Sequence, residues 1–173
     1  MRKLALITFI ALALACAHNP AGPTATATLS PTTGQTAKGT VTFTDSADGT
    51  QVVVNLTNVP PGVHGFHIHD GGSCADDAKA AGGHFNPDNM PHAAPDATSH
   101  HAGDFGNVTA DDKGEVHATF VTHSVTVAAG NHSVVGHAVV LHANPDDLAT
   151  QPTGNAGGRI ACGVVTMAGS MQH

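Results

Sequence analysis

Short stretches in which apolar and polar residues alternate are the feature that most constrains how this chain can fold. Alternation of this kind indicates β-strands with one buried face. The segments that show it are 40–44, 52–56, 65–69, 115–123, 133–142 and 159–166. The chain has 173 residues with 20 Gly and 10 Pro, which suits one domain built of short strands and turns. We therefore expect an all-β sandwich or barrel.

Two longer stretches lack this alternation. Residues 70–111 are rich in Gly, Pro, Asp and His, and a second such stretch covers residues 143–158. Loops of this length inside a compact domain are usually functional. The sequence thus predicts an all-β domain that carries two long functional loops.

Histidine is unusually frequent, and many of the histidines fall at these loops. The chain contains 14 His but only 6 Lys plus Arg. His67 and His69 are two positions apart in a strand, so both imidazoles lie on one face and can chelate the same ion. The full set of candidate donors is His67, His69, His84, His92, His101, His142 and Asp104. These donors exceed one tetrahedral site, so two metals are implied, and imidazole ligands favour zinc and copper.

The charge distribution argues against nucleic acid as a partner. Asp plus Glu number 13, the formal net charge is −7, and the few basic residues are scattered. A surface that neutralises phosphates is therefore not expected.

The N-terminus has the features of an export signal. Arg2 and Lys3 precede an apolar run that reaches Ala15, which predicts a signal peptide over residues 1–15. Residues 13–16 (ALAC) resemble a bacterial lipobox with Cys16 as the lipidated residue, and they also fit ordinary cleavage before Cys16. We expect a lipidated Cys16 and a flexible tether over 16–37 that runs into the first strand, then one domain over 38–173. The expected location is the bacterial cell envelope or periplasm, with the membrane as a partner through the N-terminal lipid.

Five segments together resemble a known family. They are GVHGFHIHD (62–70), GGHFNP (82–87), GDFGNVTAD (103–111), VVLHANPDDL (139–148) and GNAGGRIACGVV (154–165). In this order they resemble the signature segments of the Cu/Zn superoxide dismutases, over about residues 40–165. The resemblance implies an eight-stranded Greek-key β-barrel or sandwich with one copper and one zinc per chain. It also implies that superoxide is the substrate, and that copper redox cycling converts two superoxide radicals to dioxygen and hydrogen peroxide.

The same resemblance implies roles for individual residues. The implied copper ligands are His67, His69, His84 and His142, and the implied zinc ligands are His84, His92, His101 and Asp104. His84 would bridge the two metals and exchange a proton during catalysis, while Arg159 would guide the anion. Asp146 would link ligands of the two metals, and Cys74 and Cys162 would form a disulfide.

Two alternatives use the same barrel without turnover. One is an envelope copper-binding or carrier protein, and the other is a degenerate, structural family member. Loss of a copper ligand or of Arg159 would favour either, and none of these residues is lost. The oligomeric state is open, and a homodimer is one possibility. We expect surface or structural roles for His18, His64, His100, His117, His123, His132, His137 and His173, with His64 bracing a loop.

Overall fold

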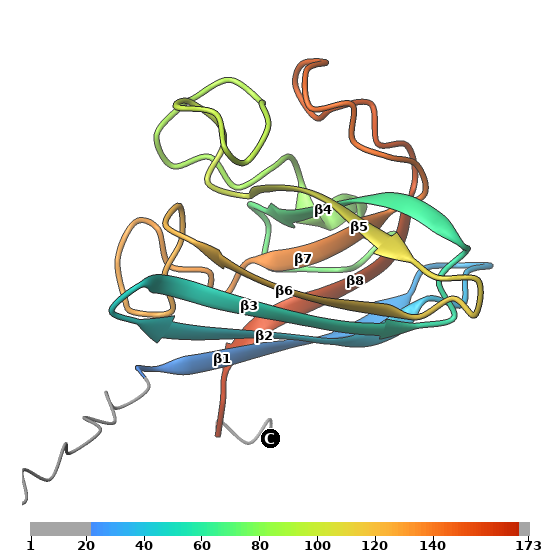
Figure 1. The fold of residues 1–173 in the computed structure, drawn as a ribbon, viewed down its shortest axis with the longest axis horizontal. Helices are drawn as coiled ribbons and strands as arrows, with labels where there is room; N and C mark the ends of the chain where they lie inside the picture. The colour runs from blue at the N-terminus through green and yellow to red at the C-terminus, as the bar shows by residue number, and fades with distance from the viewer. Residues whose placement is uncertain (1–21, 170–173) are drawn as a thin grey trace, which may run out of the picture.

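Strands joined by turns, by the two long loops over residues 70–103 and 143–158, and by a further connection over residues 123–137 make up residues 22–169, the part of the chain that the computed structural model describes (Figure 1). The strands are β1 (Thr24–Pro31), β2 (Lys38–Ser46), β3 (Gly49–Thr57), β4 (Gly62–His69), β5 (Asp104–Ala110), β6 (Val116–Thr122), β7 (Ala138–His142) and β8 (Arg159–Met167). One short 3-10 helix, η1 (Lys79–Ala81), lies in the first long loop. No helix among the described residues has the length and apolar character that crossing a membrane requires.

All paired strands are antiparallel, and their order in the sheet is β5-β4-β7-β8-β1-β2-β3-β6. The chain passes from β3 to β4 and from β6 to β7 between strands that do not pair, which is a Greek-key pattern. At the ends of this order, β5 and β6 are joined by a tight turn in which the Asp111 carboxylate accepts hydrogen bonds from the backbone N–H groups of Lys113 and Glu115. The strands form a nearly closed barrel, so the predicted fold class is confirmed.

The interior of the barrel is filled by the inward-facing residues of the strands. In β3 every second residue is buried, as the alternation predicts. The ring centre of Phe105 on β5 lies 6.5 Å from that of Phe43 on β2, 6.1 Å from Phe66 on β4 and 5.5 Å from Phe120 on β6. These rings connect both walls of the barrel, and each buried ring stabilises the fold by removing apolar surface from water.

In strand β4 the alternation of residues separates the core side chains from the candidate metal ligands. Phe66 and Ile68 point inward and belong to the main core cluster. His67 and His69 alternate with them and so project from the opposite face. They are nevertheless only 0% and 1% exposed, because the loops over residues 70–103 and 143–158 rise above β4 and β7 (Figure 1).

One strand lies where the sequence predicts a loop. β5 falls inside residues 70–111, and the prediction of a continuous loop there is wrong over 104–110. Asp104, Phe105 and Gly106 are all buried, so a period of two becomes visible only from Asn107 onward. The remaining four residues are too few for alternation to stand out.

The barrel also begins earlier than the expected boundary at residue 38. β1 lies within the range 16–37 assigned to the tether and its entry into the first strand. Ala25, Ala27 and Leu29 are buried there, between β2 and β8. Alanines carry little hydrophobic signal, which explains the late boundary. The predicted signal peptide, Cys16 and residues 170–173 lie outside the described residues.

A disulfide fastens the first long loop to the barrel. Cys74, in that loop, is bonded to Cys162 on β8, which confirms the predicted pair. The two cysteines are 88 residues apart in sequence. The bond therefore limits how far the start of the loop can move from the strand beneath it.

Candidate metal centre

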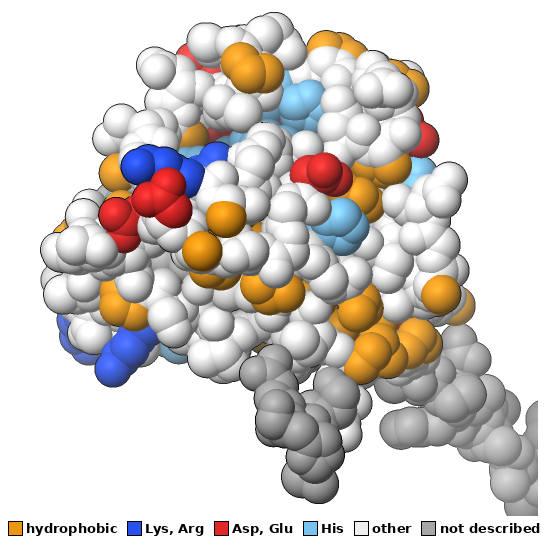
Figure 2. All heavy atoms as spheres, turned by 180° about the vertical axis from the view of Figure 1, so that it is seen from behind, with side chains coloured by type: hydrophobic (Ala, Val, Ile, Leu, Met, Phe, Trp, Pro, Cys, Tyr) orange, Lys and Arg blue, Asp and Glu red, His pale blue; other side chains and the backbone are white. Residues whose placement is uncertain are grey.

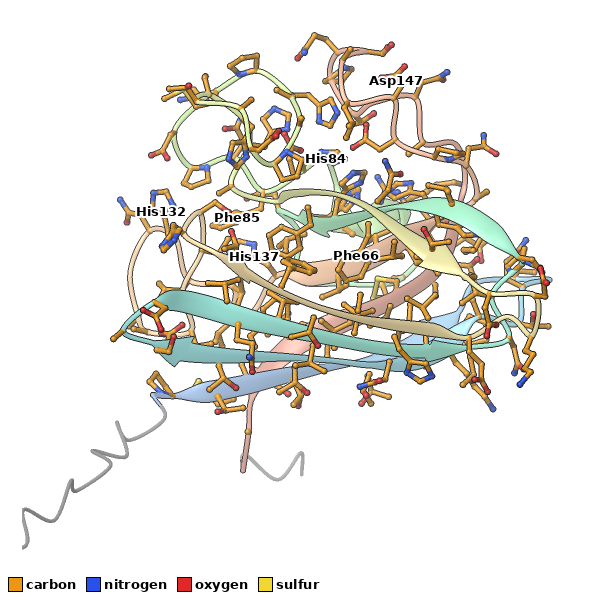
Figure 3. All side chains as sticks on the ribbon, in the orientation of Figure 1. Phe66, His84, Phe85, His132, His137 and Asp147 are labelled. Atoms are coloured by element: carbon orange, nitrogen blue, oxygen red, sulfur yellow. A yellow bond between two sulfur atoms is a disulfide. The ribbon has the colours of Figure 1, made fainter. Side chains whose placement is uncertain are left out.

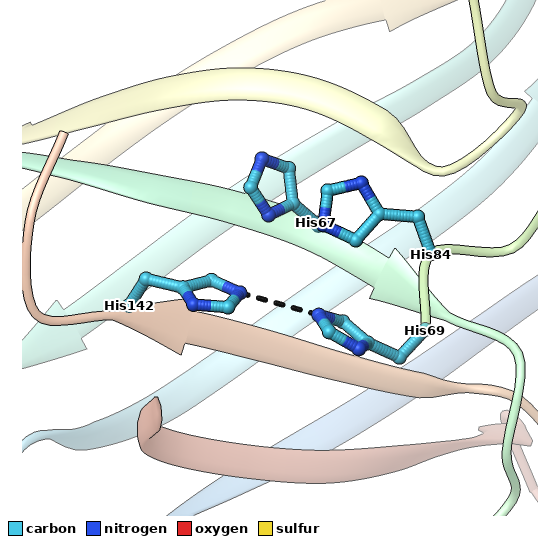
Figure 4. A group of neighbouring side chains, drawn as sticks. All are labelled: His67, His69, His84 and His142. Carbon is cyan, nitrogen blue, oxygen red and sulfur yellow. Dashed lines mark hydrogen bonds between the residues drawn. The ribbon is translucent and has the colours of Figure 1, made fainter. Parts of the chain in front are cut away.

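Four histidines from three segments meet on the outer face of β4 (Figure 4). His67 and His69 come from β4, and His142 ends β7, the strand that pairs with β4. His84 follows η1, and its backbone forms an isolated bridge with that of His69. Each contributes one ring nitrogen to a group whose members all lie within 4.8 Å of one another, and all four residues are buried.

Two of these rings are oriented by backbone carbonyl groups. Nδ1 of His69 lies 2.9 Å from the carbonyl oxygen of Gly82, and Nδ1 of His142 lies 3.3 Å from that of Gly157. A carbonyl only accepts, so each Nδ1 carries the N–H. The two Nε2 atoms then face each other at 3.2 Å (Figure 4). Fixing one ring nitrogen in this way is how proteins commonly prepare the other to bind a metal.

The other two rings each hold a buried nitrogen without a partner. Nε2 of His67 is hydrogen-bonded to Asp146, while its Nδ1 is unpaired. Nδ1 of His84 is bonded to Asp104, while its Nε2 is unpaired. An unsatisfied buried polar atom is costly, roughly 1–3 kcal/mol each. A metal ion with affinity for imidazole would satisfy both nitrogens, so this group fits copper. We call His67, His69, His84 and His142 the copper-directed group.

Asp104, the first residue of β5, is the centre of a second group. Its Oδ1 lies 2.6 Å from Nδ1 of His84, 2.9 Å from Nδ1 of His92 and 3.2 Å from Nδ1 of His101. Its Oδ2 accepts hydrogen bonds from the backbone N–H groups of His101 and Ala93. Three imidazoles and one carboxylate within 4.8 Å of one another form a four-donor set that suits zinc. We call His84, His92, His101 and Asp104 the zinc-directed group.

The structure therefore brings all seven predicted ligands together in the two predicted groups. His84 belongs to both groups, because its two nitrogens face opposite ways. Its Nδ1 faces the Asp104 carboxylate, and its Nε2 faces the group formed with His67. This is the position that a bridging ligand requires.

Asp146, in the second long loop, joins the two groups. Its Oδ2 lies 2.7 Å from Nε2 of His67, and its Oδ1 lies 3.0 Å from Nε2 of His92. Gly154 packs directly against this carboxylate with a φ of +66°. A Cβ at Gly154 would collide with Asp146 and with the His92 ring, so both the space and the backbone conformation require glycine there.

Two side-chain amides that the sequence analysis does not single out hold this link in place. Asn107 donates to the carbonyl oxygen of Asp146 at 2.9 Å and accepts from its N–H at 2.7 Å. Gln151 accepts from the N–H of His92 at 2.9 Å and donates to its carbonyl oxygen at 2.7 Å. Both residues that carry the link are thus clamped through their backbones. Asn107 lies in the segment GDFGNVTAD (103–111), but nothing in the sequence indicates this contact for Asn107 or for Gln151.

Arg159 lies across from His142 on the neighbouring strand β8. Its guanidinium donates to the carbonyl oxygens of Ala78 and Gly82, on either side of η1. The Gly82 oxygen is also the partner of His69. One carbonyl group therefore orients a copper-directed imidazole and the nearby positive charge together.

The other histidines of the described region stay outside both groups. His64 is buried, with Nδ1 2.8 Å from the His142 carbonyl oxygen and Nε2 2.7 Å from that of Pro60, which is the predicted bracing position. The ring of His137 packs against that of Phe85 in a tilted arrangement, with ring centres 4.1 Å apart (Figure 3). Since Phe85 follows His84, this contact supports the loop beside the metal centre.

Burial sets the protonation of the ligands. It lowers the pKa of His67 to about 4 and that of His142 to about 3, well below the ordinary 6.5. Burial alone would raise the pKa of Asp104, but its hydrogen bond with His84 helps to bring the value below the ordinary range. Neutral imidazoles and a charged carboxylate are the forms that bind metals.

Comparison with known proteins agrees with this geometry. The copper/zinc superoxide dismutase (SODC) family matches residues 37–165. A crystal structure described as that of the clock protein EA4 is 38% identical to this chain, with a TM-score of 0.76. The match covers 84% of this chain and 95% of that one. The family binds copper and zinc, for which the two ligand groups are suited.

The lowered histidine pKa values predict acid sensitivity of the metal-stripped protein. Unfolding returns His67 and His142 from about 4 and about 3 toward 6.5, so the unfolded chain binds more protons in between. Stability is therefore complete above pH 6.5 and is lost as pH falls toward 4 and then 3. Urea midpoints of the metal-free protein should therefore fall as pH is lowered through this range, and those of the copper- and zinc-bound protein should fall at least as steeply, because protons compete with the metals for the ligand nitrogens. A metal-free protein whose midpoint stays constant between pH 6.5 and 4 would contradict the lowered pKa values.

Removal of single ligands should separate the two groups. His84→Ala should weaken both copper and zinc binding by about 100-fold or more. Loss of a residue that only hydrogen-bonds to a metal ligand already lowers metal affinity by about 10–100-fold. His92→Ala should weaken mainly zinc binding. Metal titrations followed by elemental analysis measure both affinities, with His117→Ala as the control. A His84→Ala protein that keeps full affinity for either metal would disprove the shared position.

Proposed function

The chain belongs to the Cu/Zn superoxide dismutase family, and from this we propose that it converts two superoxide radicals to dioxygen and hydrogen peroxide. One copper and one zinc per chain are the proposed cofactors. The observation that carries the proposal is the copper-directed group, in which two buried imidazole nitrogens are unpaired and two more face each other. The complete donor set lies beside Arg159, the one cationic residue at the strand ends that form the group.

Copper, when bound, supplies one-electron chemistry between its +2 and +1 states, and zinc supplies a fixed charge because it has no redox chemistry. His67, His69 and His142 would hold copper from the ends of paired strands, which makes their positions rigid. His92, His101 and Asp104 would hold zinc at the first long loop. His84 would contact both metals.

Proton handling falls to His84 in this proposal. Its Nδ1 is fixed at Asp104, so Nε2 is the atom that can hold and release a proton on the copper side. Reduction of superoxide to hydrogen peroxide consumes protons, and an imidazole nitrogen is a group that can donate them. Deep burial of the ring keeps bulk water from competing at that atom.

Arg159 is proposed to attract the anion. The loop over residues 143–158 contains no Lys, and Lys79 in η1 is exposed beside Asp76, 3.7 Å from its carboxylate. Lys and Arg side chains are few on the face of the molecule shown in Figure 2. Because the chain is acidic and has few positive charges, attraction of the anion would depend on Arg159, whose guanidinium is held by the carbonyl oxygens of Ala78 and Gly82.

Arg159→Ala should lower kcat/KM for superoxide by about tenfold, since loss of a charge contact in a partly exposed site costs on the order of 1–4 kcal/mol. Metal content should stay unchanged, and Arg159→Lys should recover part of the rate. The rate of the wild-type protein should fall as salt rises from 0.01 to 1 M, where the Debye length shrinks from about 30 to about 3 Å. Arg159→Ala should show a flatter dependence, whereas Lys113→Ala, in the β5–β6 turn, should match the wild type. Identical slopes for wild type and Arg159→Ala would rule out this role.

The same assay separates the proposal from the carrier alternative. Protein with copper and zinc bound should consume superoxide at a rate that depends on its copper content. A protein that binds copper tightly and does not consume superoxide would instead be a copper-binding or carrier protein on the same barrel. The two results exclude each other.

We also propose that the protein is exported and attached to a bacterial membrane through lipid on Cys16. The support is in the sequence: a basic start, an apolar run and ALAC at residues 13–16. Cys16→Ser should move the protein from the membrane fraction to the soluble fraction without changing its specific activity. Mass spectrometry of the mature protein checks the modification directly, and an unmodified Cys16 there would refute the anchor.

We further propose a homodimer without nucleic acid as a partner. A groove of about 650 Å³ between β5 and β6 supports the dimer, because the apolar side chains of Phe105, Phe120 and Val121 form part of its lining beside polar residues. Val121 is 49% exposed, which suits a side chain that a second copy would cover. Sedimentation equilibrium measures the oligomeric state.

A further inference from the structure

Three histidines that neither metal group uses line one surface hollow of about 250 Å³. The hollow lies between the first long loop and the segment that follows β6, near His132 in Figure 3. Ser124 already connects these segments, because its hydroxyl donates to the carbonyl oxygen of Ala102 at 3.0 Å. Besides the hydroxyl groups of Thr98, Ser99 and Ser124, the side chains there that carry nitrogen, sulfur or carboxylate atoms are those of Asp88, Met90, His100, His123 and His132.

His132 lies between two acceptors. Its Nδ1 is 2.8 Å from the carbonyl oxygen of Ser124, so this nitrogen carries the N–H. In a neutral ring Nε2 then bears a lone pair, and Oδ2 of Asp88 stands only 3.2 Å from it. Two acceptors this close call for a positive charge between them, which either a proton on Nε2 or a metal ion supplies.

The spacing of this pair matches that of the buried ligands. Nδ1 of His101 and Oδ1 of Asp104 are also 3.2 Å apart in the zinc-directed group. Ligand atoms at about 2.0–2.1 Å from a tetrahedral ion stand about 3.3 Å apart. The distance between the His132 and Asp88 atoms thus matches the spacing of two ligands on one ion, and it also suits an ion pair between a protonated His132 and Asp88.

His100 offers a third donor, and its ring, like that of His132, is held at Nδ1 by a backbone carbonyl group. Its Nδ1 lies 2.7 Å from the carbonyl oxygen of His101, which leaves Nε2 with the lone pair. This is the arrangement that orients His69 and His142 in the copper-directed group. His123 and Met90 are exposed at the same hollow. Only the two buried groups bring three donors within 4.8 Å among residues 22–169, so the third contact requires rotation of a surface side chain.

We propose that Asp88, His100 and His132 form a third metal site, at the surface, for a divalent ion of the zinc or copper type. Imidazole with one carboxylate is a donor set for such ions. His123 or the thioether of Met90 supplies the further contact. A bound ion would tie the first long loop to the segment after β6, outside the buried centre. The site stands independently of any superoxide chemistry.

The test counts metal ions bound per chain. Protein with both buried groups filled is dialysed against Zn²⁺, and bound metal is measured by elemental analysis. We expect one ion beyond the buried two in the wild type, and an affinity lower by at least about 10–100-fold in both His132→Ala and Asp88→Asn. Absence of the extra ion from the wild type, or its retention in His132→Ala, would overturn the proposal.

His117→Ala is the matched control. His117 is also an exposed imidazole near a carboxylate, 3.6 Å from Glu115, and its Nδ1 contacts the side chain of Asn55. It should leave the number of bound ions unchanged. In NMR spectra of the wild type, Zn²⁺ should shift the ring signals of His100 and His132 and not those of His117. Equal shifts for all three rings would mean nonspecific binding and would also overturn the proposal.

Discussion

The carboxylate of Asp146 keeps the two metal-binding groups in a fixed relation. One oxygen reaches His67 on a barrel strand, and the other reaches His92 on a long loop. The carboxylate can do this because the side-chain amides of Asn107 and Gln151 hold the backbones at either end of the link. Gly154 leaves the space that it occupies. Contacts within the protein thus help to fix the relation between the two groups.

Barrel and loops contribute differently to the centre. Three of the four copper-directed histidines lie on β4 and β7, where backbone pairing and a packed core restrict movement. The zinc-directed group is drawn mainly from the first long loop, together with Asp104 at the start of β5. Binding of an ion there couples to the order of the loop, because the ligands must be held together against chain entropy. His84 transmits that order to the copper side.

The sequence was sufficient for the parts of the molecule that follow a strict period or a specific motif. Alternation in β4 places His67 and His69 on one face, and the family resemblance supplied the full ligand set. It was insufficient where burial breaks the period, as in β5, or where small residues weaken it, as with Ala25 and Ala27 in β1. The roles of Asn107 and Gln151 depend on loops that meet only in the folded chain. The Gly82 oxygen is a backbone atom, so no side-chain pattern could reveal it.

The carbonyl group of Gly82 links the disulfide to the geometry beside the metal ligands. It belongs to the loop that Cys74 anchors to β8, and it orients both His69 and Arg159. In a reducing compartment the two cysteines stay as thiols. The loop is then not bonded to β8, and the Gly82 oxygen can move away from both His69 and Arg159. One covalent bond outside both ligand groups thus holds a metal-directed imidazole and a cation in place at the same time.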